Sequence, residues 1–162
     1  MQSFGRFFLP LVLCLIAASC TSPAETNSVN ISNTNLAATI SNKANPKPEE
    51  LGMLINFTLE PEDIVWQQID SPKKVVAVFR LDEEDTKKFA DQLSAKSQGA
   101  ARAVPVEDWF PPELRAGAET TGSSTIDGTA FPADEFYQAP YTQGTITRID
   151  NTDFFVLELS AP

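Results

Sequence analysis

The spacing of apolar residues after residue 50 separates strand-like segments from one helix-like segment. Residues 51–59 alternate and predict a half-buried strand, whose apolar side carries Leu51, Met53, Ile55, Phe57 and Leu59. Residues 75–81 form a nearly unbroken run of β-branched and aromatic residues, which predicts a strand covered on both faces. Between them, residues 61–63 open a turn or a short helix, and residues 64–66 fit either a helix or another strand.

Residues 82–98 carry the pattern of an amphipathic helix. Asp82 can cap it, and the three acids that follow occupy the first turn, where the helix dipole favours negative charge. Phe89 and Leu93 are four residues apart and therefore share a face, and Gly99 ends the pattern. We expect the face with Phe89 and Leu93 to pack on a sheet.

The C-terminal part contains shorter strand signals. Residues 104–106 predict a short strand that runs into a tight or helical turn at Pro111 and Pro112, because proline supplies no ladder donor. Residues 117–130 are rich in Gly, Ser and Thr and predict a long loop. Residues 145–149 and 154–159 flank a polar four-residue connection, which predicts a hairpin that ends the chain as an edge strand.

Together these elements predict a single small α+β domain over residues 51–162. We expect a mixed or mostly antiparallel sheet of about five strands, with one main helix packed on one face. The segment before it differs in composition, since residues 21–50 hold 14 Ser, Thr and Asn in 30 positions and no aromatic residue. Such a segment buries too little apolar surface to offset the entropy of ordering, so residues 20–50 predict a disordered tether.

The first residues have the organisation of an export signal. Arg6 precedes the apolar run Phe7–Ala18, whose 12 residues suit a signal peptide and fall short of the roughly 20 that a spanning helix needs. The run ends in Ile16-Ala17-Ala18-Ser19-Cys20, which resembles the lipobox of bacterial lipoproteins, with Ala17 where Leu is usual. The resemblance covers residues 1–20. It implies that residues 1–19 are removed and that Cys20 carries a diacylglycerol thioether and an N-acyl chain such as palmitate.

A lipidated Cys20 implies an exported protein held at a membrane of the bacterial cell envelope. Thr21 follows the cysteine where inner-membrane lipoproteins of Gram-negative bacteria often carry Asp, which favours the outer membrane if the host has one. The alternative is an ordinary signal peptide, whose removal would release a secreted soluble protein with an unacylated Cys20.

Composition excludes several kinds of chemistry. The chain has no histidine, and both cysteines, Cys14 and Cys20, lie in or directly after the export segment. The domain therefore lacks the side chains for histidine-assisted nucleophilic catalysis, thiolate or imidazole metal sites and disulfides, and we expect no metal ion and no cofactor. With 22 acidic against 12 basic residues, the net charge of −10 also disfavours nucleic acid as a partner.

The candidate binding residues are aromatic and flank the predicted loop: Trp109, Phe110, Tyr137 and Tyr141. Tryptophan and tyrosine are over-represented in binding hot spots because they combine a large contact area with a polar group. We expect a non-enzymatic binding or accessory module whose partner is an envelope protein or a polysaccharide, with Trp109 as the main contact. The alternative is a small envelope hydrolase that uses a carboxylate pair drawn from Glu60, Glu62, Asp63, Glu107, Asp108 and Glu113.

Overall fold

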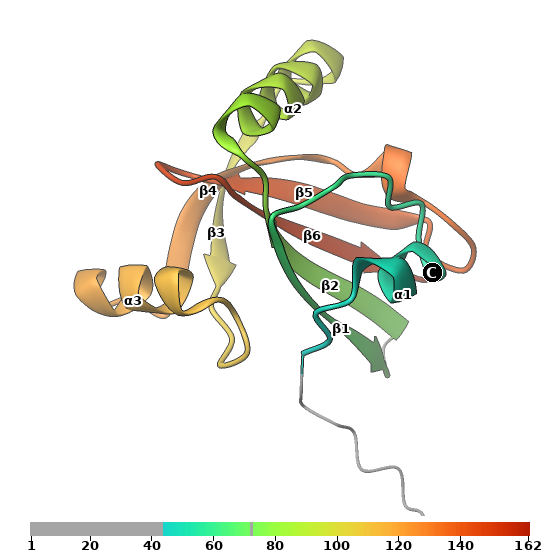
Figure 1. Ribbon diagram of the computed structural model, residues 1–162, viewed down its shortest axis with the longest axis horizontal. Helices are drawn as coiled ribbons and strands as arrows, with labels where there is room; N and C mark the ends of the chain where they lie inside the picture. Colours follow the sequence, from blue (N-terminus) through green and yellow to red (C-terminus); the bar gives the residue numbers. More distant parts are fainter. Residues whose placement is uncertain (1–43, 72) are drawn as a thin grey trace, which may run out of the picture. The chain divides into compact units, whose positions relative to one another are not determined.

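The computed structural model describes residues 44–71 and 73–162, whose strands form one antiparallel sheet (Figure 1). In space the strands follow the order β1-β2-β6-β5-β4-β3. In chain order their bounds are β1 (Asp63–Asp70), β2 (Lys73–Arg80), β3 (Ala100–Pro105), β4 (Thr125–Pro132), β5 (Gln143–Ile149) and β6 (Phe154–Ser160). Four of the neighbouring pairs are also consecutive in sequence: β1 with β2, β3 with β4, β4 with β5 and β5 with β6.

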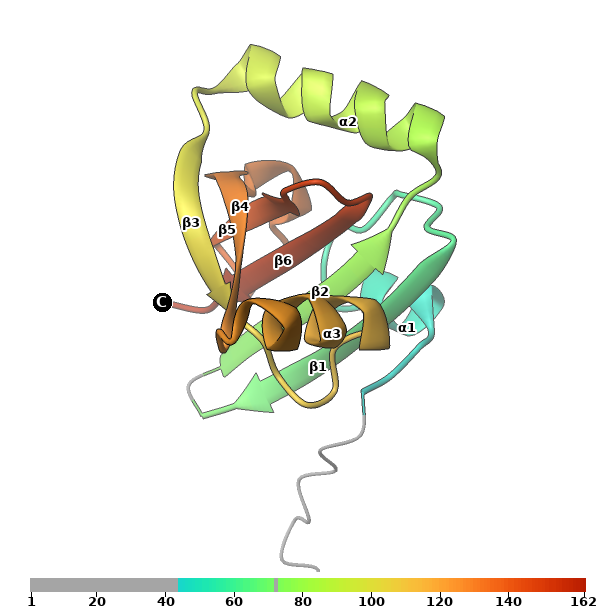
Figure 2. The ribbon, with the colours of Figure 1, turned by 90° about the vertical axis from the view of Figure 1, so that its left-hand side faces the viewer.

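Helices lie on both sides of this sheet. α2 (Glu83–Lys96) and the short α1 (Pro48–Gly52) pack on one side, and α3 (Pro112–Thr121) packs on the other (Figure 2). A single 3₁₀ turn, η1 (Asp134–Phe136), follows β4. The predicted α+β class with antiparallel pairing is confirmed, whereas the expectation of about five strands and one main helix on one face is wrong.

Two apolar clusters explain why both faces are covered. The α2-side cluster includes Phe79, Phe89 and Phe155, and the α3-side cluster includes Phe110 and Leu114. β2 and β6 send alternate side chains into the two clusters, as expected for interior strands of a sheet with two packed faces. The prediction that residues 75–81 form a strand covered on both faces is therefore confirmed.

The predicted helix after β2 is confirmed, including its capping residue. The Asp82 carboxylate accepts a hydrogen bond from the Asp85 backbone N–H at 2.8 Å, which satisfies one of the free donors at the helix start. Phe89 and Leu93 are buried against the sheet side, with 5% and 2% of their surface exposed. α2 ends at Lys96, before Gly99.

The predicted strand over residues 51–59 is wrong. Pro48 and Leu51 lie in α1, and the Ile55 N–H donates to the Leu51 carbonyl at 3.1 Å, so the chain makes a helical turn here. Phe57 and Leu59 still contact the α2-side cluster, but as irregular chain. The alternating pattern matches burial at Leu51 and Ile55 but not at Met53, which is 70% exposed, and a strand also needs a neighbouring ladder.

The predicted loop over residues 117–130 is also wrong. α3 extends to Thr121 and ends at Gly122, whose φ of 67° lies in the left-handed region that glycine adopts without strain. β4 then begins at Thr125, and Ile126 and Phe131 are buried, one on each side of the sheet. The small and polar residues of β4 are typical of a loop. They form a strand because the two neighbouring strands, β3 and β5, supply the hydrogen bonds that hold it.

The hairpin of β5 and β6 is confirmed, but its last strand is not at an edge. β6 pairs with β5 on one side and with β2 on the other, over residues 154–160. Its run Phe-Phe-Val-Leu-Glu-Leu is as continuously apolar as that of β2, apart from Glu158. The rule that placed β2 in the interior of the sheet therefore applies equally to β6.

The described part of the chain begins inside the segment predicted as a tether. Asn45 forms an isolated antiparallel bridge with Trp66 of β1, in which each backbone N–H donates to the other carbonyl, at 2.8 and 2.9 Å. The Trp66 indole N–H donates to the Lys47 carbonyl at 2.9 Å.

Cys20 and the predicted signal peptide lie outside the described residues. None of the helices in the described ranges has the length and apolar character of a membrane span.

Candidate functional site

Trp109 lies in the connection between β3 and α3, on the α3 side of the sheet. Its neighbour Phe110 has only 3% of its surface exposed and anchors this connection in the α3-side cluster. The two rings meet edge to face, with centroids 4.7 Å apart and an interplanar angle of 72°. Trp109 itself is half-buried, so part of its indole remains available for contact.

A hollow of about 170 Å³ lies beside Trp109. Its apolar wall includes Trp109, Pro105 and Ile69, and Ile69 is 39% exposed at the end of β1. Glu107 and Lys74 add polar groups to the same hollow. We call the surface formed by Ile69, Pro105, Glu107 and Trp109 the Trp109 surface.

A second hollow, of about 300 Å³, continues along the same connection. Its lining includes Pro111, Pro112 and Glu113 from the connection and Val65 from β1. The connection from Trp109 to Glu113 therefore lines both hollows along β1, which suits a ligand longer than a single side chain.

Some charged side chains around these hollows form ion pairs and others do not. Within the described ranges, Glu107 and Glu113 form no ion pair, although each lines one hollow. Lys74, the cation at the Trp109 hollow, is already bound by the Glu158 carboxylate at 2.7 Å. The unpaired charge along this face of the connection is therefore negative.

Glu158 and Lys74, which line the Trp109 hollow, belong to an ion cluster that joins four strands. Glu158 of β6 accepts hydrogen bonds from Lys74 of β2 and from Arg102 of β3, and Arg102 also donates to the Thr145 hydroxyl of β5. Glu158 has 16% of its side chain exposed and each cation 33%, so the cluster is largely removed from water. It holds the far strand β3 against the centre of the sheet.

The structure does not bring the four predicted aromatic residues together. Trp109 and Phe110 contact the α3-side cluster, whereas Tyr137 and Tyr141 contact the α2-side cluster. Tyr137 is half-buried and its hydroxyl donates to the Gly144 carbonyl at 3.4 Å. The four residues therefore do not form a single binding patch. Trp109 and Phe110 both line the Trp109 hollow, and of these two Trp109 is the one that is not buried.

Tyr141 belongs to the domain core. Its side chain is 1% exposed, and its hydroxyl has no hydrogen-bond partner among the described residues. Burial is the main cause that raises the pKa of Tyr141, and the negative charge of Asp70 adds to the effect. The phenol is therefore held in its neutral form, as expected for a side chain that fills space between strands.

The carboxylates considered for hydrolysis are all exposed, and only some of them lie near one another. Asp63 and Glu113 line the second hollow together, but the Arg80 guanidinium binds Asp63 and also lies 3.6 Å from Glu62. Glu107 lines the other hollow. No group of three metal-ligating side chains occurs in residues 44–71 and 73–162.

Sequence reasoning missed the ion cluster, although two signals were present. Glu158 interrupts an otherwise apolar strand, and an acid at such a position needs a buried partner. Arg102 lies two residues before Val104 and therefore shares the face of β3 that packs on α3. The partners themselves come from distant strands, so only the sheet order could identify them.

Comparisons with protein-family models, with curated proteins and with solved structures gave no match to this chain.

Proposed function

We propose that the chain is a lipid-anchored, non-enzymatic binding module of the bacterial cell envelope, and that the Trp109 surface contacts its partner. The observation that carries this proposal is the half-buried indole of Trp109, which is fixed by Phe110 beside an open hollow. A rigid aromatic side chain with remaining exposed area is the kind of residue that dominates binding energy in protein interfaces.

The chemistry of the surroundings favours a protein partner with basic and aliphatic side chains. Ile69, Pro105 and Trp109 supply apolar contact area, and Glu107 and Glu113 supply carboxylates without a cation among the described residues. A partner with Lys or Arg beside an aliphatic residue would satisfy both features, and the negative charge would accelerate its approach. An acidic polysaccharide would be repelled by the same carboxylates.

A photo-crosslinking experiment tests this contact. A photoreactive phenylalanine is placed at Ile69 in the full chain, which is produced in its own bacterium, and covalent adducts are measured after irradiation. We expect an adduct that proteases digest, and we expect Trp109→Ala to reduce its yield at least tenfold, since loss of an aromatic anchor costs about 2 kcal/mol or more. A Glu107→Lys/Glu113→Lys variant should also lower the yield.

Met53 offers a matched control for this experiment. It is 70% exposed, lies next to α1 and is apolar, so a photoreactive residue there samples the surface without contacting the Trp109 surface. Adducts of equal yield at both positions, or an adduct at Ile69 that persists in Trp109→Ala, would contradict the proposed contact. An adduct that resists proteases and is removed by glycosidases would replace the protein partner with a polysaccharide.

The anchor is tested separately through Cys20. Cells grown with a palmitate analogue should label the full chain, and Cys20→Ala should abolish the label and move the protein from the membrane fraction to the soluble fraction. The physical reason is that each buried methylene adds about 0.8 kcal/mol of membrane affinity, so two or three acyl chains hold the protein firmly. A Cys20→Ala protein that still incorporates label, or an unlabelled and secreted parent protein, would contradict the anchor.

The alternative of a small hydrolase rests on one observation. Asp63 and Glu113 line the same hollow, as a carboxylate pair that acts on a sugar must. Against it, Arg80 neutralises Asp63, both acids are exposed, and the hollow is lined by prolines and Val65 rather than by hydrogen-bonding groups. These features favour binding over catalysis at this place.

A further inference from the structure

A pocket of the described part lies on the other side of the sheet, beneath α2. Its volume is about 460 Å³, within the range of small-molecule sites. β5 contributes Arg148, β4 contributes Thr129, and the turn between β5 and β6 contributes Asp150 and Asn151. α2 closes the pocket from above with Ser94.

Arg148 differs from the other cations of the described residues. Lys47, Lys74, Lys88, Lys96, Arg80 and Arg102 form ion pairs, while Lys73, Lys87, Arg115 and Arg148 form none. Lys73, Lys87 and Arg115 are exposed, so water solvates them, whereas Arg148 is half-buried in the pocket. In a chain with 22 acids, a partly desolvated guanidinium without a carboxylate is a group suited to bind an anionic ligand.

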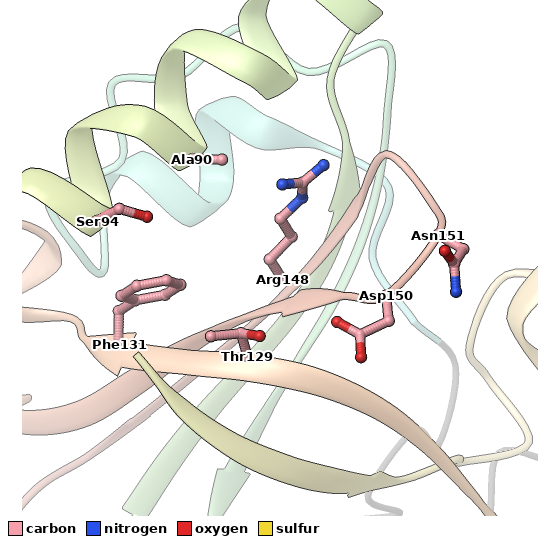
Figure 3. Close-up of a pocket in the computed structure, with 7 residues that line it drawn as sticks. All are labelled: Ala90, Ser94, Thr129, Phe131, Arg148, Asp150 and Asn151. Carbon is pink, nitrogen blue, oxygen red and sulfur yellow. The ribbon is translucent and has the colours of Figure 1, made fainter. Parts of the chain in front are cut away.

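The arrangement of the side chains leaves the guanidinium accessible. Figure 3 shows Arg148 extending from β5 toward α2, while the Asp150 carboxylate lies below it on the side of Thr129. No acidic oxygen in the described ranges lies within ion-pairing distance of Arg148. The planar guanidinium can therefore offer its donors to a ligand as a fork, the geometry that a carboxylate accepts.

The other polar groups of the pocket are also unused. Within the described part of the chain, the side chains of Ser94, Thr129, Asp150 and Asn151 make no hydrogen bond. The turn that carries two of them is nevertheless fixed, because the Asp150 N–H donates to the Asp127 carbonyl at 3.0 Å. The pocket thus presents hydroxyl, amide and carboxylate groups on a held backbone.

We propose that this pocket binds a small acidic sugar, with the Arg148 guanidinium on the sugar carboxylate and Asp150 accepting hydrogen bonds from its hydroxyl groups. Asp150 disfavours a multiply charged anion such as phosphate, because its own charge would lie beside the second negative charge. The same carboxylate favours a ligand that has one negative group and several donors. This site lies opposite the Trp109 surface and does not depend on it.

Isothermal titration of the purified full chain with glucuronate tests the proposal. We expect saturable binding of glucuronate, with glucose, which lacks the carboxylate, at least tenfold weaker. Arg148→Ala should weaken glucuronate binding at least tenfold, and Arg148→Lys should retain part of it, because an ammonium supplies charge without the fork. Arg115→Ala is the matched control, since Arg115 is unpaired but exposed on α3. This variant should bind glucuronate with the affinity of the parent.

Further arms separate the acidic sugar from other ligands of the same charge. Asp150→Asn should weaken glucuronate binding and strengthen phosphate binding, since it removes an acceptor and a negative charge together. Arg148→Met keeps the apolar stem of the side chain, so a loss of affinity in this variant with an unchanged melting temperature assigns the loss to the missing charge. Phosphate or alanine binding more tightly than glucuronate, or equal titrations of the parent, Arg148→Ala and Arg148→Met, would overturn the proposal.

Discussion

Phe155→Ala is expected to lower the free energy of unfolding by about 3–5 kcal/mol, the range for removing a fully buried aromatic ring from a core. Phe155 has none of its surface exposed and lies on β6 at the centre of the sheet. Its ring stacks on Phe79 of β2 with centroids 5.5 Å apart, and it meets Phe89 of α2 edge to face at 5.1 Å. The substitution therefore weakens the sheet and the attachment of α2 together.

Urea denaturation measures this loss as a lower midpoint at an unchanged slope. Met53→Ala is the control, because Met53 is 70% exposed and its truncation should change the free energy by no more than about 0.5 kcal/mol. Phe155→Leu keeps most of the volume and should cost less than the alanine variant, which provides a second value if Phe155→Ala does not fold. A loss below about 1 kcal/mol for Phe155→Ala would contradict the packing of α2 on β6.

The parts of the fold that local chemistry determines were predictable from the sequence. α2 carries its own cap at Asp82 and its own stripe of Phe89 and Leu93, and both features act within a few residues. The continuous apolar run of β2 predicts a strand covered on both faces. The polar connection before β6 predicts the hairpin of β5 and β6. Each of these elements occurs where its pattern placed it.

The parts that depend on distant partners were not predictable. β4 has an interior glycine and several small residues, and it is a strand because β3 and β5 bind it on both sides. Residues 55–59 show the opposite case, because their sequence alternates like that of a strand but they pair with no other strand among the described residues. Hydrophobic periodicity reports which side chains face the core, and pairing decides whether the backbone is a strand.

The same division applies to the candidate sites. Trp109 could be singled out as a candidate contact residue because tryptophan is over-represented in binding hot spots. Tyr141 could not be assigned to the core from residue type, since tyrosine occurs in both environments, and only the structure shows it 1% exposed. Arg148 was not recognised, because its significance lies in the absence of an ion pair in the described chain, which no sequence pattern contains.

Glu158→Ala is expected to lower the free energy of unfolding by about 2 kcal/mol. Removing one partner of a fully buried ion pair costs about 3–5 kcal/mol, because the remaining charge loses its compensation. Here two cations, Lys74 and Arg102, would remain without their carboxylate, but each is 33% exposed and water would recover part of the cost. The value therefore lies below the range for a fully buried pair, and it is measured by urea denaturation.

A double substitution separates the ion cluster from simple packing. Glu158→Leu with Arg102→Met removes the carboxylate and one of its cations and fills the space with apolar atoms, so the pair should cost less than the sum of the single changes. Glu119→Ala is the control, since Glu119 is exposed on α3 without an ion pair in the described residues and should change stability by no more than about 0.5 kcal/mol. Additive losses in the double variant would show that Glu158 stabilises the sheet by volume alone. If the losses are additive, we also expect the losses in free energy of unfolding from Trp109→Ala and Glu158→Ala to add, although both residues line the Trp109 hollow.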